Sequence, residues 1–180
     1  VGGFGGLQEL PGLNKPVIAA VNGIAFGGGF EIMISADIII AADHATFALP
    51  EINSGTLADA ATIKLPRRIP YHVAMELLFT GRRMDAHEAK QWGIVNEIVT
   101  QPNLMIRARE VAAMLADGPP LVFAAIKETV RETERLTVQE AFDLVTKRKL
   151  KTVDALYASD DQKEGARAFA EKRKPVWKGR

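Results

Sequence analysis

Apolar residues in the first third of the chain occur in short runs that are separated by turn-forming residues. PVIAAVN at 16–22 is bounded on both sides by turn residues and predicts a buried strand. IIIAAD at 38–43 is β-branched and predicts a second strand, and ATFAL at 45–49 predicts a third. FEIMISAD at 30–37 predicts a short buried helix between the first two strands. This order of elements indicates an α/β fold.

Beyond residue 60 the pattern becomes helical. Helices are expected at about 70–79 and 85–92, with Gly81 and Gly93 placed as C-terminal caps. Asp85 has Glu88 three residues later, which is the spacing of a capping box. The sequence further predicts a last short strand at 94–99 and amphipathic helices at about 101–116, 119–134, 137–150 and 159–173.

The late helices carry apolar stripes, as at Leu144, Val145 and Leu150. Such stripes need a surface to pack against, which either the strand-rich half of the chain or a neighbouring subunit could supply.

Composition limits the classes of function. The 180 residues suffice for one domain with a sizeable core, and the net charge of +1 indicates neither nucleic acid nor a membrane surface as partner. The absence of cysteine excludes disulfides and thiolate chemistry, which fits a reducing compartment, and we expect a cytoplasmic protein. The chain starts with Val1 in the glycine-rich VGGFGG, which predicts a truncated, cleaved or incomplete N-terminus.

The glycine run at Gly27, Gly28 and Gly29 precedes the predicted short helix. Glycines there let the backbone pass close to a ligand and leave unpaired N–H groups at the helix start, which is a site for an anion or an oxyanion. The alternative is a tight packing turn between strand and helix. The spacing does not match a dinucleotide-binding or P-loop motif.

Two acids lie at the ends of apolar elements. Glu31 falls in the first turn of the predicted helix, where it could instead reach back to the helix cap, and Glu51 follows the strand at 45–49. Two carboxylates near an oxyanion-binding helix start are suited to adding or removing water. The three histidines are scattered without metal-ligand spacing, so no metal is expected, and no serine lies in GxSxG.

Three segments resemble the crotonase (enoyl-CoA hydratase/isomerase) family. KPVIAAVNGIAFGGGFEIMISADIIIAADHATFALPE is similar to its central signature without gaps, and LLFTGRRMDAHEAKQWGIVNEIV to its next block. FAEKRKPVWKGR resembles the tail of the carnitinyl-CoA dehydratase branch. The resemblance implies the C-terminal portion of a crotonase ββα spiral over 1–115, followed by a helical trimerisation region over 116–180. A homotrimer or a dimer of trimers is therefore expected.

The resemblance also implies roles for individual residues. Gly28 matches the backbone donor that holds the thioester carbonyl of acyl-CoA, and Glu31 and Glu51 match the two catalytic glutamates. Coenzyme A enters as part of the substrate, and no separate cofactor is expected. The residues that the resemblance assigns to substrate binding are Gly27, Phe30, Gly55, Asp59 and Lys172, the last against the CoA phosphates.

Two departures from the family pattern stand out. After Glu51 the family reads G-x-x-P-x-x-G-G, whereas this chain has GTLADAATIKLP, with Ala58 in place of proline and no Gly-Gly pair. The family's N-terminal part, which supplies the second oxyanion N–H, is outside this sequence.

The favoured hypothesis is reversible hydration of a 2-enoyl-CoA, with carnitinyl-CoA and crotonobetainyl-CoA as the preferred pair. An enoyl- or dienoyl-CoA isomerase is the first alternative. The second is a non-catalytic acyl-CoA-binding or assembly module.

Overall fold

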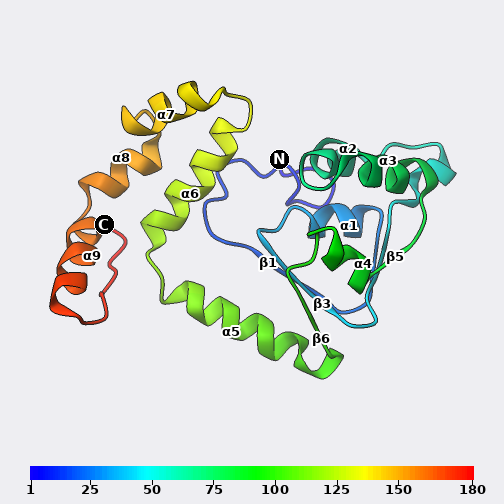
Figure 1. Cartoon of the computed structure of the whole chain (residues 1–180), viewed down its shortest axis with the longest axis horizontal. Coiled ribbons are helices and arrows are strands. Elements are labelled where there is room, and N and C mark those ends of the chain that lie inside the picture. Colours follow the sequence, from blue (N-terminus) through cyan, green and yellow to red (C-terminus); the bar gives the residue numbers. More distant parts are fainter. The chain divides into compact units, whose positions relative to one another are not determined.

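The computed structural model describes residues 1–180, which divide into two compact units (Figure 1). The first unit comprises 1–11 and 16–112, and the second comprises 12–15 and 113–180. None of the helices combines the length and the apolar character that crossing a membrane requires.

The first unit contains two three-stranded sheets. One is parallel, in the order β1-β3-β6, and the other has β2 and β4 parallel with β5 antiparallel to β4. The strands are β1 (Ile18–Val21), β2 (Ile24–Phe26), β3 (Ile38–Ala42), β4 (Thr46–Ala48), β5 (Met84–Asp85) and β6 (Glu97–Val99).

The path from strand to strand to helix repeats along the chain. β1 and β2 lead into α1 (Gly28–Met33), and β3 and β4 lead into the 3₁₀ helix η1 (Pro50–Ser54) and α2 (Asp59–Lys64). Ile18 pairs with Ile38, and Phe26 pairs with Ala48. Successive repeats therefore lie side by side, and β2 and β4 end at the same edge of their sheet.

The first unit contains five further helices, and the three α-helices among them lie where the sequence pattern predicted a helix. They are η2 (Leu65–Arg67), α3 (Tyr71–Thr80), α4 (Ala86–Gln91), η3 (Gln101–Asn103) and α5 (Leu104–Ala116), which crosses the boundary between the units. Gly81 caps α3 in the left-handed conformation, at φ 61°. The Asp85 side chain accepts the N–H of Glu88 at 2.8 Å, so this N-cap is confirmed.

The capping box predicted at Asp85 is only half formed. The Glu88 carboxylate binds Arg82 at 2.6 Å and Trp92 at 3.2 Å instead of returning to the cap. The hydrogen bond from Arg82 lowers the pKa of Glu88, and that from Trp92 adds to this effect, against the opposing influence of burial.

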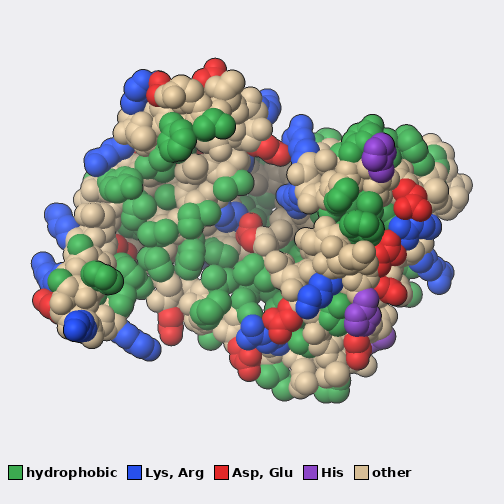
Figure 2. All heavy atoms as spheres, viewed as in Figure 1, with side chains coloured by type: hydrophobic (Ala, Val, Ile, Leu, Met, Phe, Trp, Pro, Cys, Tyr) green, Lys and Arg blue, Asp and Glu red, His purple; other side chains and the backbone are tan.

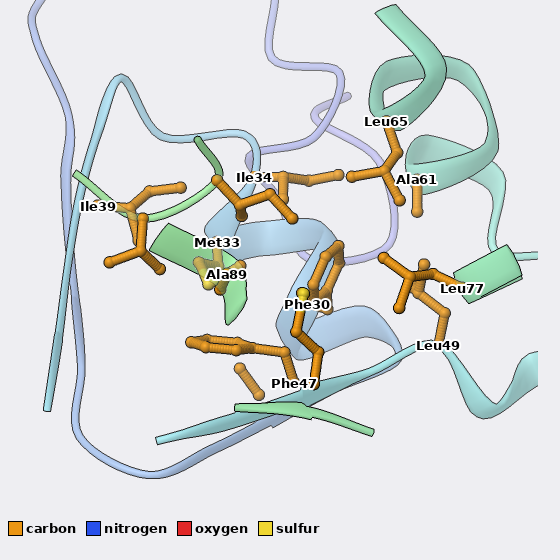
Figure 3. Close-up of a cluster of buried hydrophobic side chains, with 14 of the residues drawn as sticks. Phe30, Met33, Ile34, Ile39, Phe47, Leu49, Ala61, Leu65, Leu77 and Ala89 are labelled. Carbon is orange, nitrogen blue, oxygen red and sulfur yellow. The ribbon is translucent and has the colours of Figure 1, made fainter. Parts of the chain in front are cut away.

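The core of the first unit forms around two aromatic rings (Figure 3). Phe30 of α1 and Phe47 of β4 are both 0% exposed and meet edge to face, with ring centroids 6.2 Å apart. Burying each large apolar side chain stabilises the fold by about 1.5–3 kcal/mol. These two rings fix α1 against β4, the strand that leads to Glu51.

The second unit is helical, with α6 (Pro120–Thr133), α7 (Val138–Thr146), α8 (Lys151–Ala158) and α9 (Asp160–Glu171). Its core contains Ala125, Leu150 and Val153, against which Leu144, Val145 and Leu156 pack. The stripe predicted at Leu144, Val145 and Leu150 therefore has partners within the unit. Figure 2 shows further hydrophobic side chains on the surface of these helices, and the exposed ones include Ile126, Val130 and Phe142.

The prediction of one helix over 137–150 is wrong at its end. α7 stops at Thr146, Arg148 takes a positive φ of 50°, and α8 follows as a separate helix that the sequence pattern did not indicate.

The C-terminal segment folds back on α9. Asp161, which is 2% exposed, accepts the N–H groups of Lys178 at 2.7 Å and Gly179 at 2.8 Å. The Trp177 ring lies 3.3 Å from the point that a Cβ on Gly165 would occupy. These contacts order the segment that resembles a family tail.

We expect Phe47→Ala to lower the free energy of unfolding by about 3–5 kcal/mol, because it opens a cavity beside Phe30. Urea denaturation followed by circular dichroism measures the change. Phe169→Ala is the matched control, because Phe169 is 88% exposed, and it should stay within about 0.5 kcal/mol of the unaltered protein. Equal effects of the two substitutions would contradict the core described here.

Candidate active site

The start of α1 is held against the end of β4. Gly27 precedes the helix at φ 53°, and its N–H donates to the Ala48 carbonyl at 2.9 Å. The Gly27 carbonyl accepts the first helical hydrogen bond, from the Glu31 N–H, at 3.0 Å. Gly28 is the first helical residue, and helix geometry leaves its N–H without a partner inside the helix. That amide points out of the positive end of the helix, as an oxyanion donor requires.

Glu51 reaches the same place from the neighbouring strand. It is the second residue of η1, which follows β4. A Cβ atom on Gly27 would lie only 2.8 Å from Glu51 Oε1, so the carboxylate packs where any other residue at position 27 would carry its side chain. The second oxygen, Oε2, is buried and has no hydrogen-bond partner. Buried polar atoms are nearly always paired, so an unpaired carboxylate oxygen beside a helix start marks a candidate reactive group.

Glu31 is buried and makes a long-range contact. It is 7% exposed, and its Oε1 accepts the backbone N–H of Ala61 at 3.0 Å. Ala61 lies in the first turn of α2, whose cap residue Ala58 makes no capping hydrogen bond with its side chain. Glu31 therefore supplies an acceptor to the start of α2. The Glu31 carboxylate therefore does not reach back to the cap of its own helix.

An apolar cavity of about 170 Å³ opens beside Glu51. Glu51 is the one charged residue in its wall, which otherwise contains Leu49, Ile52, Thr56, Leu57, Ala58, Thr62, Pro66, Met75, Leu78 and Phe79. Part of this wall comes from 56–62, the segment that departs from the family pattern. The cavity has the character of a pocket for an acyl chain.

The other predicted substrate-binding residues have different surroundings. The Phe30 side chain is fully buried in the core and is not part of this cavity wall. Gly55 ends η1 in the left-handed conformation, at φ 66°. Asp59 is an exposed residue at the start of α2 and is not part of the cavity wall. Lys172 is exposed at the end of α9, in the second unit.

Sequence patterns gave no indication of two parts of the site. The Ala61 amide is a backbone donor, which no side-chain pattern reveals. Met75, Leu78 and Phe79 were predicted only as part of a helix. The exposure of Phe79, at 67%, is the kind of signal that a helical-wheel comparison of α3 could have found.

These groups together suit one kind of chemistry. An amide at a helix start can stabilise negative charge that develops on a carbonyl oxygen. The two carboxylates lie near the same cavity, since Glu51 is in its wall and contacts Gly27, and Glu31 accepts an N–H from α2, which contributes Thr62 to the wall. They can accept and donate protons at carbons next to that carbonyl.

Comparison with known proteins gives consistent results. The family model described as enoyl-CoA hydratase/isomerase matches residues 3–180. The carnitinyl-CoA dehydratase of Citrobacter koseri is 51% identical over 180 residues, which cover 99% of this chain and 69% of that protein. The carnitinyl-CoA dehydratase of Escherichia coli K12 has the same identity and coverage.

A solved structure agrees with these sequence matches. The enoyl-CoA hydratase of Mycobacterium tuberculosis H37Rv superposes with a TM-score of 0.88 at 36% identity, over 97% of this chain and 68% of that one. The α/β fold is therefore crotonase-like, and the chain belongs to the enoyl-CoA hydratase/isomerase (crotonase) family of enzymes.

Proposed function

We propose that the protein catalyses the reversible addition of water to the double bond of a 2-enoyl-CoA thioester. The observation that carries this proposal is the buried, unpaired Oε2 of Glu51 beside the start of α1. A hydratase needs an acid or base at the carbon next to the thioester carbonyl and a donor for the carbonyl oxygen. Glu51 and the Gly28 amide provide groups of these two kinds.

The proposed reaction proceeds through an enolate-like species. Glu31 accepts a proton from water while the water oxygen bonds to the β-carbon, and the electrons of the double bond move toward the carbonyl oxygen, where the Gly28 N–H stabilises the charge. Glu51 gives a proton to the α-carbon. Proton transfer from Glu31 back to Glu51 restores both groups, so one water is consumed for each double bond.

For the substrate pair we propose carnitinyl-CoA and crotonobetainyl-CoA. The support is the 51% identity to proteins named carnitinyl-CoA dehydratase. A second candidate is a short, uncharged 2-enoyl-CoA such as crotonyl-CoA, because the wall of the 170 Å³ cavity is apolar apart from Glu51. A trimethylammonium group is best held by a carboxylate or an aromatic face. Phe79 is the aromatic residue in this wall.

We also propose assembly into a homotrimer or a dimer of trimers. Exposed apolar side chains on the second unit, such as Ile126, Val130 and Phe142, support this. Sedimentation equilibrium should give three or six times the monomer mass, and a monomer across micromolar concentrations would contradict it.

We expect Glu31→Gln and Glu51→Gln each to lower kcat for hydration of crotonyl-CoA or crotonobetainyl-CoA by about 10²–10⁴-fold, because each removes a group that transfers a proton. Loss of the enoyl-thioester absorbance measures the rate. Glu110→Gln is the control, because its side chain is 58% exposed and pairs only on the surface with Arg107. Undiminished turnover in either site variant would refute the proposal, and a double-bond shift without water uptake would identify an isomerase.

Phe79→Ala distinguishes the two substrates. If the trimethylammonium group binds the Phe79 face, this substitution should raise KM for crotonobetainyl-CoA several-fold, by the about 0.5–2 kcal/mol of a cation–π contact, and change KM for crotonyl-CoA less. Phe79→Leu keeps an apolar side chain without the aromatic face and should show the same selective effect. Equal changes for both substrates, with crotonyl-CoA the faster, would favour the uncharged acyl group.

A further inference from the structure

Phe4 is an exposed aromatic residue beside the candidate oxyanion donor. Its side chain is 96% exposed, and it belongs to the glycine-rich segment VGGFGG, to which the proposed reaction gives no role. The ring Cε1 and Cδ1 atoms lie 3.1 and 3.3 Å from the point that a Cβ on Gly28 would occupy. Single exposed apolar residues are common on protein surfaces, but Phe4 also lies directly beside Gly28.

The turn that carries Phe4 is fixed to the helices of the site. The Gly5 N–H donates to Gln8 Oε1 at 2.5 Å, and the Glu9 N–H donates to the Gly2 carbonyl at 3.1 Å. Gln8 is 7% exposed, and its carbonyl accepts Lys64 Nζ of α2 at 2.7 Å. These contacts hold the turn in place without covering the Phe4 ring.

Gly5 shows that the turn also lies directly on α1. A Cβ on Gly5 would lie 2.4 Å from Cγ1 of Ile32, so a side chain at this position would require Ile32 to move. The turn is therefore seated on the same helix whose first amide belongs to Gly28. Residues before and after Phe4 in the sequence make these contacts, which hold Phe4 next to the Gly28 amide.

Gly27 and Gly28 thus have different groups beside the points that their Cβ atoms would occupy. Glu51 lies over Gly27, and the Phe4 ring lies over Gly28. A thioester whose carbonyl accepts the Gly28 N–H would lie near both the Glu51 carboxylate and the Phe4 ring. The ring would shield that carbonyl from water, which strengthens the hydrogen bond to it.

We propose that Phe4 contacts the bound acyl-CoA thioester and is a positioning residue for it on the Gly28 side of the site. This inference rests on the proposed function, because it takes an acyl thioester as the ligand. It assigns a role to a residue in the turn before the first strand. The contact is apolar and stacks on the planar thioester, so it acts on the acyl end of the substrate and not on the nucleotide end.

The test compares Phe4→Ala and Phe4→Leu with the unaltered protein. Calorimetric titration with butyryl-CoA, a saturated thioester that cannot be hydrated, measures binding directly. Phe4→Ala should weaken butyryl-CoA binding about 3- to 10-fold, the range of a single aromatic contact, and Phe4→Leu should recover part of the loss. Binding of free CoA should not change, and the midpoint of thermal unfolding should stay constant because the side chain is 96% exposed.

Phe169→Ala serves as the matched control, since it removes an equally exposed phenylalanine, at 88%, from α9. Butyryl-CoA binding should be unchanged in this variant. A loss of free-CoA affinity in Phe4→Ala equal to the loss for butyryl-CoA would assign Phe4 a general structural role and overturn the proposal, as would butyryl-CoA affinity unchanged in Phe4→Ala.

Failure of the proposed function gives a different result. Suppose that the unaltered protein binds butyryl-CoA more tightly than Phe4→Ala does but hydrates no 2-enoyl-CoA. The contact between Phe4 and the thioester is then supported, and the hydratase proposal fails. If the unaltered protein hydrates 2-enoyl-CoA and Phe4→Ala matches it in both KM and butyryl-CoA affinity, the hydratase proposal holds and the role of Phe4 fails. If the protein binds no acyl-CoA, both fail.

Discussion

The site depends on the close approach of Glu51 to the backbone at Gly27. The carboxylate occupies the position of a side chain at residue 27, and Gly27 has a positive φ of 53°, so a larger residue would be both strained and in collision with Glu51. The Gly27 N–H is bound to Ala48, which precedes Leu49 and η1. Gly27 therefore determines where α1 starts against the end of β4 and how closely Glu51 approaches the backbone.

The parallel pairing of β2 with β4 explains why two distant acids meet the same helix start. Phe26 lies opposite Ala48, so the chain leaves both strands at one edge of the sheet, toward α1 in one case and η1 in the other. Ligand sites of α/β proteins form at such carboxyl ends. The buried contact between Phe30 and Phe47 holds α1 against β4. Glu31 then ties α1 to α2 through the Ala61 amide, which combines a structural role with the proposed catalytic one.

Much of this arrangement could be predicted from the sequence, because apolar runs and turn residues reveal buried strands and helix ends. β1, β3, β4, α3 and α4 lie where the pattern indicated, and the glycine run does begin a helix. The pattern did not reveal β2, which is three residues long between glycines, or the break at Arg148 that separates α7 from α8. The pattern did predict the short buried helix that contains Phe30, and the substrate-binding role of this residue was implied only by the family resemblance. Contacts between segments far apart in sequence, such as Glu51 on Gly27 and Phe4 on Gly28, follow only from the fold.

The central claim is that the Gly28 amide receives the thioester carbonyl. The most direct measurement is the ¹³C NMR shift of butyryl-CoA labelled at the carbonyl carbon, free and bound to the protein under conditions where calorimetry shows saturation. A hydrogen bond from a helix-start amide polarises the carbonyl, so the bound resonance should move downfield. A bound thioester with the chemical shift of the free one would contradict the account.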